Sequence, residues 1–171
     1  MNIVLIGYRG AGKSSVAKVL ADQLGRIVIS TDAEIVSRAN LSIPEIVKSC
    51  GWVHFRDLES QVCRELAGKD GMIIDTGGGV ILRQENVDAL KANGMLFWLT
   101  AEVPTIQARI GGDTQRPSLT GTKSFTEEIE DVLRERHPRY QAAADYVIAT
   151  DGCSLHQIAD AVLARFKPAG G

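Results

Sequence analysis

The sequence predicts an α/β protein of three layers (α/β/α), in which a five-stranded parallel sheet lies between two layers of helices. Short apolar runs rich in β-branched residues alternate with longer segments whose apolar residues recur at helical spacing. This alternation is typical of parallel strands joined by helical crossovers. A glycine-rich segment also joins the first strand to the first helix, and polar residues follow later strands. Because ligands bind at this end of such a sheet, the fold also predicts where a site lies.

In the first third of the chain, the expected strands cover 2–6 and 27–29, both short apolar runs. Between them, apolar residues at helical spacing predict a helix that ends at Gly25. After the second strand we expect a short helix that ends at Asn40. Another helix begins at Ser42, because a glutamate three residues later completes a capping-box pattern.

A longer helix then begins at Gly51 and carries an apolar stripe. The remaining strands are expected over 72–74, 95–99 and 146–148, and the remaining helices over 85–90, 104–110, 125–144 and 155–166. Within the helix over 125–144, Pro138 predicts a kink or an end, because proline lacks the N–H that the helix needs.

The composition is 44% hydrophobic and 23% charged, with a formal net charge of −2, and the 171 residues suit one domain. Such a charge gives no basic field to attract nucleic acid or an anionic membrane. No run approaches the ~18 apolar residues of a membrane span, and the N-terminus has no basic segment like that of a signal peptide. The three cysteines show no metal-ligand spacing and indicate free thiols in a reducing compartment. We therefore expect a cytoplasmic monomer.

Residues 7–14, GYRGAGKS, match the phosphate-binding pattern G-x-x-x-x-G-K-[ST] between a strand and a helix. Glycines let the backbone wrap a polyphosphate, and the N-terminal end of the helix adds positive charge. Lys13 can contact the β- and γ-phosphates of a nucleotide, and the Ser14 hydroxyl can hold Mg²⁺. Arg9 is interpreted as an exposed, variable position. The residues expected to bind the nucleotide here are Gly7, Gly10, Ala11, Gly12, Lys13, Ser14 and Ser15.

Periodicity vanishes from Gly111 to Ser124. A stretch of this length in a compact domain predicts a flexible lid that closes over bound nucleotide and excludes water. Arg116 lies within this stretch.

Five further features of the chain resemble shikimate kinase, a family of small kinases with the P-loop NTPase fold. They are Asp32 after the second strand, the run 51–56 with Glu59, the triplet Gly77-Gly78-Gly79, the pair Arg116-Pro117 and the R-x-P-x-Y element 136–140. The similarity runs from Ile3 to about Val147. It implies a single P-loop kinase domain over 1–171, with the lid at about 111–124 and a helical substrate-binding segment at about 31–66.

The resemblance implies transfer of the γ-phosphoryl group of ATP, with Mg²⁺ as cofactor, to the 3-hydroxyl of shikimate. The implied catalytic residues are Lys13, Asp32 and Arg116. The implied substrate-binding residues are Asp32, Arg56, Gly77, Gly78, Gly79 and Arg136. Arg109 is expected near the adenine and Arg116 over the phosphates. The residue types suit this chemistry, since a guanidinium fork binds a carboxylate and a carboxylate can orient the attacking hydroxyl.

One position departs from the family, which usually has Asp-x-Asp after the second strand, the first Asp helping to hold Mg²⁺. Here Ser30 takes the first place. Asp75 ends the third strand, where P-loop NTPases commonly keep a carboxylate for the metal. We therefore expect Ser14 and Asp75 to hold Mg²⁺, unless Asp75 only caps its loop.

The same residues also allow a different acceptor or a different role. The acceptor could be another small polyol acid such as gluconate, or the chain could be a nucleotide-binding regulator that has lost activity with the missing Asp. Arg56 could simply pair with Glu59 on a solvated helix face, and the glycine triplet could be a loose loop.

Overall fold

The computed structural model describes residues 1–111 and 125–166, and it contains the predicted parallel sheet. The strand order is β2-β3-β1-β4-β5, and every neighbouring pair is parallel. The strands are β1 (Asn2–Ile6), β2 (Val28–Ser30), β3 (Ile73–Asp75), β4 (Gly94–Thr100) and β5 (Tyr146–Ala149). The predicted α/β class with five strands is therefore confirmed.

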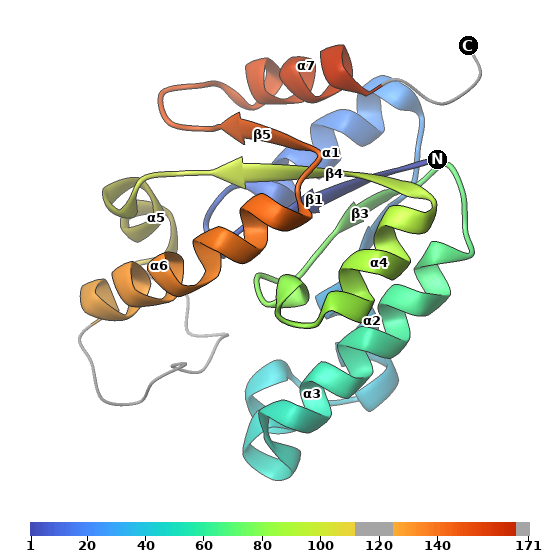
Figure 1. Cartoon of the computed structure of the whole chain (residues 1–171), viewed down its shortest axis with the longest axis vertical. Helices are drawn as coiled ribbons and strands as arrows, with labels where there is room; N and C mark the ends of the chain where they lie inside the picture. The colour runs from blue at the N-terminus through green and yellow to red at the C-terminus, as the bar shows by residue number, and fades with distance from the viewer. Residues whose placement is uncertain (112–124, 167–171) are drawn as a thin grey trace.

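Helices cover both faces of this sheet (Figure 1). On β1, Ile3 and Leu5 pack into one buried cluster with residues of α1 and α7, while Val4 and Ile6 pack into the other with α2, α3, α4 and α6. This alternation makes the three layers, because successive side chains of a strand point to opposite faces. The helices are α1 (Lys13–Leu24), α2 (Thr31–Ala39), α3 (Ile43–Ala67), α4 (Gln84–Ala92), α5 (Val103–Ile110), α6 (Phe125–Ala143) and α7 (Leu155–Arg165).

The segment around Gly51 forms two helical pieces within α3, as predicted. Ser42 caps its start with the capping box that the sequence indicates, the Ser42 side chain accepting from the Glu45 N–H. At Gly51 the backbone is not helical (φ 81°, ψ 169°), so α3 is kinked there. This kink separates the first part of α3 from the part that carries Phe55 and Arg56.

Several boundaries differ from the prediction. β2 and β3 each end one residue later than expected, because the polar residues Ser30 and Asp75 pair with each other in the parallel ladder. A short 3₁₀ helix, η1 (Val80–Leu82), was not predicted. Helix α6 does not end at Pro138, which lies on an exposed face where water can bond to the carbonyl left without a partner. None of the helices in the described ranges is long and apolar enough to cross a membrane.

Candidate active site

The nucleotide side of the site is the loop between β1 and α1. Gly7 has a φ of +145°, and a Cβ there would come within 2.5 Å of the Leu99 carbonyl oxygen of β4. A side chain at this position would therefore displace backbone, which explains the first glycine of the motif. The loop, together with the N-terminal end of α1, lines a cavity of about 650 Å³.

Lys13 is the first residue of α1 and is largely buried. Its Nζ donates to the carbonyl oxygens of Gly7 at 2.8 Å and Tyr8 at 3.0 Å. These bonds hold the ammonium group over the loop, where an oxygen of a bound phosphate would compete with the carbonyls for the same protons.

Ser14 and Asp75 lie together at the edge of the nucleotide cavity. The Ser14 Oγ donates to the Asp75 Oδ2 at 2.5 Å. Ser30, which stands where the family usually has a carboxylate, pairs with Asp75 across β2 and β3, and its own side chain caps α2 by accepting from the Ala33 N–H. The chain thus keeps one carboxylate at this strand end, on β3 and not on β2.

The donor set of Ser14 and Asp75 fits a hard cation such as Mg²⁺, which prefers oxygen ligands and is commonly bound by one or two carboxylates and substrate phosphates. Within residues 1–111 and 125–166, no group of three or more His, Cys, Asp or Glu side chains could hold a metal alone. Phosphate oxygens and water would therefore have to complete the coordination of any ion here.

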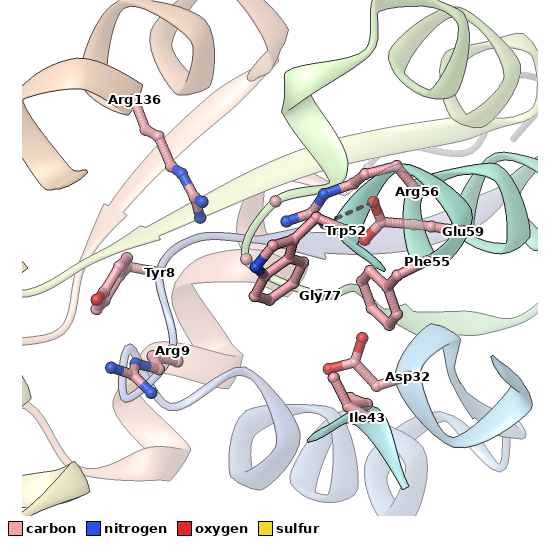
Figure 2. A pocket seen from close by; sticks show the side chains of 12 residues that line it. Tyr8, Arg9, Asp32, Ile43, Trp52, Phe55, Arg56, Glu59, Gly77 and Arg136 are labelled. Carbon is pink, nitrogen blue, oxygen red and sulfur yellow. Dashed lines mark hydrogen bonds and ion pairs between the residues drawn. The ribbon is translucent and has the colours of Figure 1, made fainter. Parts of the chain in front are cut away.

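A second cavity adjoins the first, and the two share Arg9 and Asp32 (Figure 2). We call it the acceptor cavity. Its walls come from the nucleotide loop, α2, α3, α6 and the loop after β3. The residues that line it are Tyr8, Arg9, Asp32, Ile43, Trp52, Phe55, Arg56, Glu59, Gly77, Gly78, Gly79 and Arg136. Asp32 thus lies at the boundary between the two cavities, within the first turn of α2.

Arg56 forms the cationic wall of the acceptor cavity. Its Nη1 donates to the Glu59 Oε2 at 2.8 Å, one turn along α3, and Glu59 has no exposed surface. Burial raises the pKa of Glu59 above its usual range, while the charge and hydrogen bond of Arg56 oppose that rise. The hypothesis that this pair lies on a solvated helix face is therefore wrong, since the pair faces the cavity.

The glycine triplet follows β3 and lines one side of the acceptor cavity. A Cβ on Gly79 would overlap the Arg56 guanidinium, and a Cβ on Gly77 would come within 2.6 Å of the Asp32 Oδ1. The backbone therefore approaches both charged side chains as only glycine allows. Close packing of this kind does not fit a loose loop.

The remaining arginines of the prediction fall in different places. Arg136, on α6, is buried and lines the acceptor cavity opposite Arg56 (Figure 2). Arg109, on α5, lines the nucleotide cavity, and its Nη1 donates to the Gly10 oxygen at 3.1 Å and the Thr150 Oγ1 at 3.2 Å. Arg116 and most of the predicted lid lie outside the described residues.

Sequence reasoning did not assign six of the residues that line the acceptor cavity to a site: Tyr8, Arg9, Ile43, Trp52, Phe55 and Glu59. Arg9 is half-buried at the boundary of both cavities, so the interpretation as an exposed position is wrong. The Trp52 ring lies 5.3 Å from the Arg56 guanidinium carbon. The spacing of four residues between Trp52 and Arg56 was the available signal, because it puts both on one helix face.

Comparisons with known proteins show the family to which this chain belongs. A family model described as shikimate kinase matches residues 9–167. A shikimate kinase of Dehalococcoides mccartyi strain 195 is 38% identical over 161 residues, which cover 94% of this chain and 90% of that protein. One of Nitratidesulfovibrio vulgaris is 41% identical over 152 residues, 87% of this chain and 86% of that one.

A solved structure is also closely similar in fold. The shikimate kinase from Acinetobacter baumannii, determined in complex with shikimate, is 33% identical, with a TM-score of 0.90 over 97% of this chain and 95% of that one. The sequence similarity and the structural similarity both extend over nearly the whole chain. The chain therefore belongs to the shikimate kinase family.

Proposed function

We propose that this protein transfers the γ-phosphoryl group of ATP to the 3-hydroxyl of shikimate. The observation that carries the proposal is the meeting of two cavities at Asp32, one lined by the phosphate loop with Lys13 and the other by Arg56. A carboxylate at that boundary can accept a hydrogen bond from the attacking hydroxyl, orienting it and taking its proton. The relatives named shikimate kinase and the neighbour solved with shikimate support this substrate.

On the donor side, we propose that the loop residues bind the phosphates of ATP through backbone N–H groups and that Lys13 neutralises charge on the β- and γ-oxygens. Phosphoryl transfer asks a protein mainly for positioning and charge stabilisation. We propose that Arg109 contacts the nucleotide near its adenine, and its position in the lining of the nucleotide cavity supports this. Arg116 is proposed to act from the lid as a further positive charge on the transferring group.

On the acceptor side, we propose that Arg56 and Arg136 bind the carboxylate of shikimate. Charge-assisted bonds of this kind contribute about 1.5–3 kcal/mol each. The two guanidinium groups lie on α3 and α6 at opposite walls of the same cavity. Asp32 and the glycine triplet then face the ring hydroxyls.

Mg²⁺ is the proposed cofactor, held by Ser14 and Asp75, and it would neutralise charge on the phosphate oxygens when bound.

Asp75→Asn tests this assignment, because it keeps the size of the side chain but removes its charge. We expect the variant to need a higher Mg²⁺ concentration for half-maximal activity, and direct titration of the nucleotide-bound protein with Mn²⁺, followed by electron paramagnetic resonance, to show weaker metal binding. Ser30→Asp in the Asp75→Asn background should restore both the Mg²⁺ requirement and the metal affinity, since the two positions are paired across β2 and β3. An unchanged metal requirement in Asp75→Asn would refute the assignment.

We further propose one kinase domain over 1–171 that works as a monomer, with a lid that closes at about 111–124 and a substrate-binding helical segment at about 31–66. ATP should protect the lid from limited proteolysis. Equal cleavage with and without ATP would contradict the lid assignment.

The decisive experiment is a coupled assay of ADP release with ATP and shikimate, quinate or gluconate as acceptor. We expect release that depends on shikimate, with analogues that lack its hydroxyl pattern rejected by up to about 10⁴-fold. Gluconate-dependent release would favour a kinase for another polyol acid. ATP binding without acceptor-dependent ADP release would favour a regulator.

A further inference from the structure

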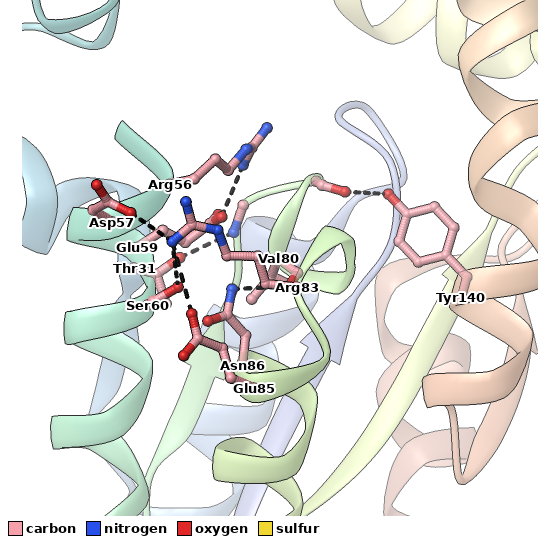
Figure 3. Close-up of polar contacts among 12 residues, drawn as sticks. Thr31, Arg56, Asp57, Glu59, Ser60, Val80, Arg83, Glu85, Asn86 and Tyr140 are labelled. Atoms are coloured by element: carbon pink, nitrogen blue, oxygen red, sulfur yellow. Dashed lines mark hydrogen bonds and ion pairs between the residues drawn. The ribbon is translucent and has the colours of Figure 1, made fainter. Parts of the chain in front are cut away.

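The glycine triplet is held from both sides by buried hydroxyl groups (Figure 3). From α2, the Thr31 Oγ1 accepts a hydrogen bond from the Gly77 N–H at 3.0 Å. From α6, the Tyr140 Oη donates to the Gly78 carbonyl oxygen at 2.5 Å. Both side chains are fully buried. The triplet is therefore fixed by residues that do not themselves line the acceptor cavity.

These bonds determine the direction of the remaining N–H groups. In a trans peptide the C=O and the following N–H point in opposite directions. The Gly78 carbonyl points to Tyr140, so the Gly79 N–H points away from α6. The Gly77 carbonyl accepts from the Val80 N–H at 3.2 Å, so the Gly78 N–H points away from η1.

These two N–H groups are available to a ligand. Neither the Gly78 nor the Gly79 N–H has a hydrogen-bond partner among the residues that the structure describes. Both glycines are buried and line the acceptor cavity. A buried N–H group without a partner is destabilising, so a ligand oxygen that accepts from it is favoured.

Tyr140 is suited to hold this arrangement. Its ring stacks on Trp98 of β4 with 5.4 Å between centroids, which fixes the direction of the hydroxyl. Burial raises the pKa of Tyr140 to about 12, so the hydroxyl stays protonated and remains a donor near neutral pH. Arg136 lies four residues earlier on the same helix, and its positive charge opposes the rise in the pKa of Tyr140. Two residues one turn apart on α6 therefore have different positions, Arg136 lining the acceptor cavity and Tyr140 holding the triplet.

We propose that Tyr140 and Thr31 are positioning residues that aim the Gly78 and Gly79 N–H groups at the oxygens of the acceptor. The proposal rests on the proposed function, because it assigns these residues to recognition of that acceptor. They act through the peptide groups and not by touching the substrate. Their loss therefore weakens acceptor binding while leaving the nucleotide cavity, which contains neither the triplet nor Tyr140, unaffected.

The test compares Tyr140→Phe and Thr31→Val with matched controls. Each variant removes one hydroxyl that bonds to the triplet and nearly keeps the volume of the side chain. Tyr146→Phe removes a hydroxyl from a partly exposed tyrosine of β5, and Thr31→Ser keeps the acceptor oxygen. The measurements are the KM for shikimate, the KM for ATP and kcat, together with calorimetric binding of shikimate and a thermal melt of each variant.

We expect Tyr140→Phe and Thr31→Val to raise the KM and the Kd for shikimate by about 5- to 30-fold, as the loss of one buried hydrogen bond implies. The KM for ATP should stay near that of the wild type, and both controls should behave as the wild type does. If one variant fails to fold, the other carries the test. An unchanged KM for shikimate in the folded variants, or equal increases for shikimate and ATP, would overturn the proposal. Wild-type protein without shikimate-dependent ADP release would instead overturn the proposed function.

Discussion

The nucleotide cavity and the acceptor cavity share a boundary at Arg9 and Asp32, yet they are built in different ways. In the nucleotide cavity, the phosphate loop is formed by consecutive residues, 7–15, through their backbone conformation, and more distant residues such as Asp75 and Arg109 line the rest. The acceptor cavity is assembled from segments far apart in the chain and depends on side chains that hold one another. Its space is also smaller, about 30 Å³ against about 650 Å³ by the same measure.

This difference indicates where each substrate gains its specificity. A loop of backbone N–H groups binds any polyphosphate, so it alone selects little. We expect specificity in the acceptor cavity to come from charged side chains that are buried and paired, as Arg56 is with Glu59. Substitutions on the acceptor side should therefore change the KM for one substrate, and substitutions at the boundary should change both.

The largest expected effect is that of Arg56→Lys. Lysine keeps the charge beside Glu59 but loses the planar fork that binds a carboxylate through two N–H groups. The KM for shikimate should rise by about 10²-fold, which corresponds to one lost charge-assisted bond, with the KM for ATP unchanged. Arg64→Lys, the same change at an exposed position of α3, serves as the control in steady-state kinetics. A rise in both KM values would contradict the expectation that substitutions in the acceptor cavity affect shikimate alone.

The same difference explains what the sequence could predict. The phosphate loop lies in one short stretch between a strand and a helix, so its role followed from local spacing. The walls of the acceptor cavity depend on tertiary packing. Trp52 reads as a core residue and Glu59 as an exposed one, because apolar residues are usually buried and carboxylates usually solvated. Only the resemblance to a family pointed to Arg56 and Arg136.

The fold was predictable for a related reason. Apolar periodicity marks every strand and long helix, whereas η1 has too few residues to show a period. The ends of β2 and β3 were misplaced because Ser30 and Asp75 are polar, and only their pairing in the ladder makes them part of the strands. These strand ends carry polar groups of the site, so the errors in the predicted strand ends fall next to the site residues.

A moderate effect is expected from Arg9→Met at the boundary. Arg9 lines both cavities, so loss of its charge should raise the KM for ATP and the KM for shikimate together, each on the order of 5-fold for a half-exposed charge. Arg134→Met removes an exposed arginine from α6 and is the matched control. A change in only one of the two KM values would place Arg9 in that cavity alone.

An effect on the KM of similar size is expected from Glu59→Gln, a variant that also tests the pH dependence of stability. Glutamine still accepts a bond from Arg56 but without charge, so the KM for shikimate should rise by about 3- to 10-fold. Because burial raises the pKa of Glu59, the unfolded chain releases this proton first as the pH rises above about 4.5. The free energy of unfolding of the wild type therefore falls as the pH rises from there through the folded pKa. Glu59→Gln should lack this fall.

Glu65, on the same helix, is expected to change the free energy of unfolding with pH in the opposite direction, and Glu65→Gln removes that change. The hydrogen bond from Arg38 lowers the pKa of Glu65, so its contribution to stability is present above the unfolded pKa of about 4.5 and is lost as the pH falls through the folded pKa. Urea unfolding across the acid range measures both effects. The free energy of unfolding should change with pH because of Glu59 above pH 4.5, and by a small amount because of the exposed Glu65 below it. If Glu59→Gln followed the wild-type pH profile, the pKa of Glu59 would be unshifted, as in a solvated carboxylate, and Arg56 would need another explanation for its fixed position beside the glycine triplet.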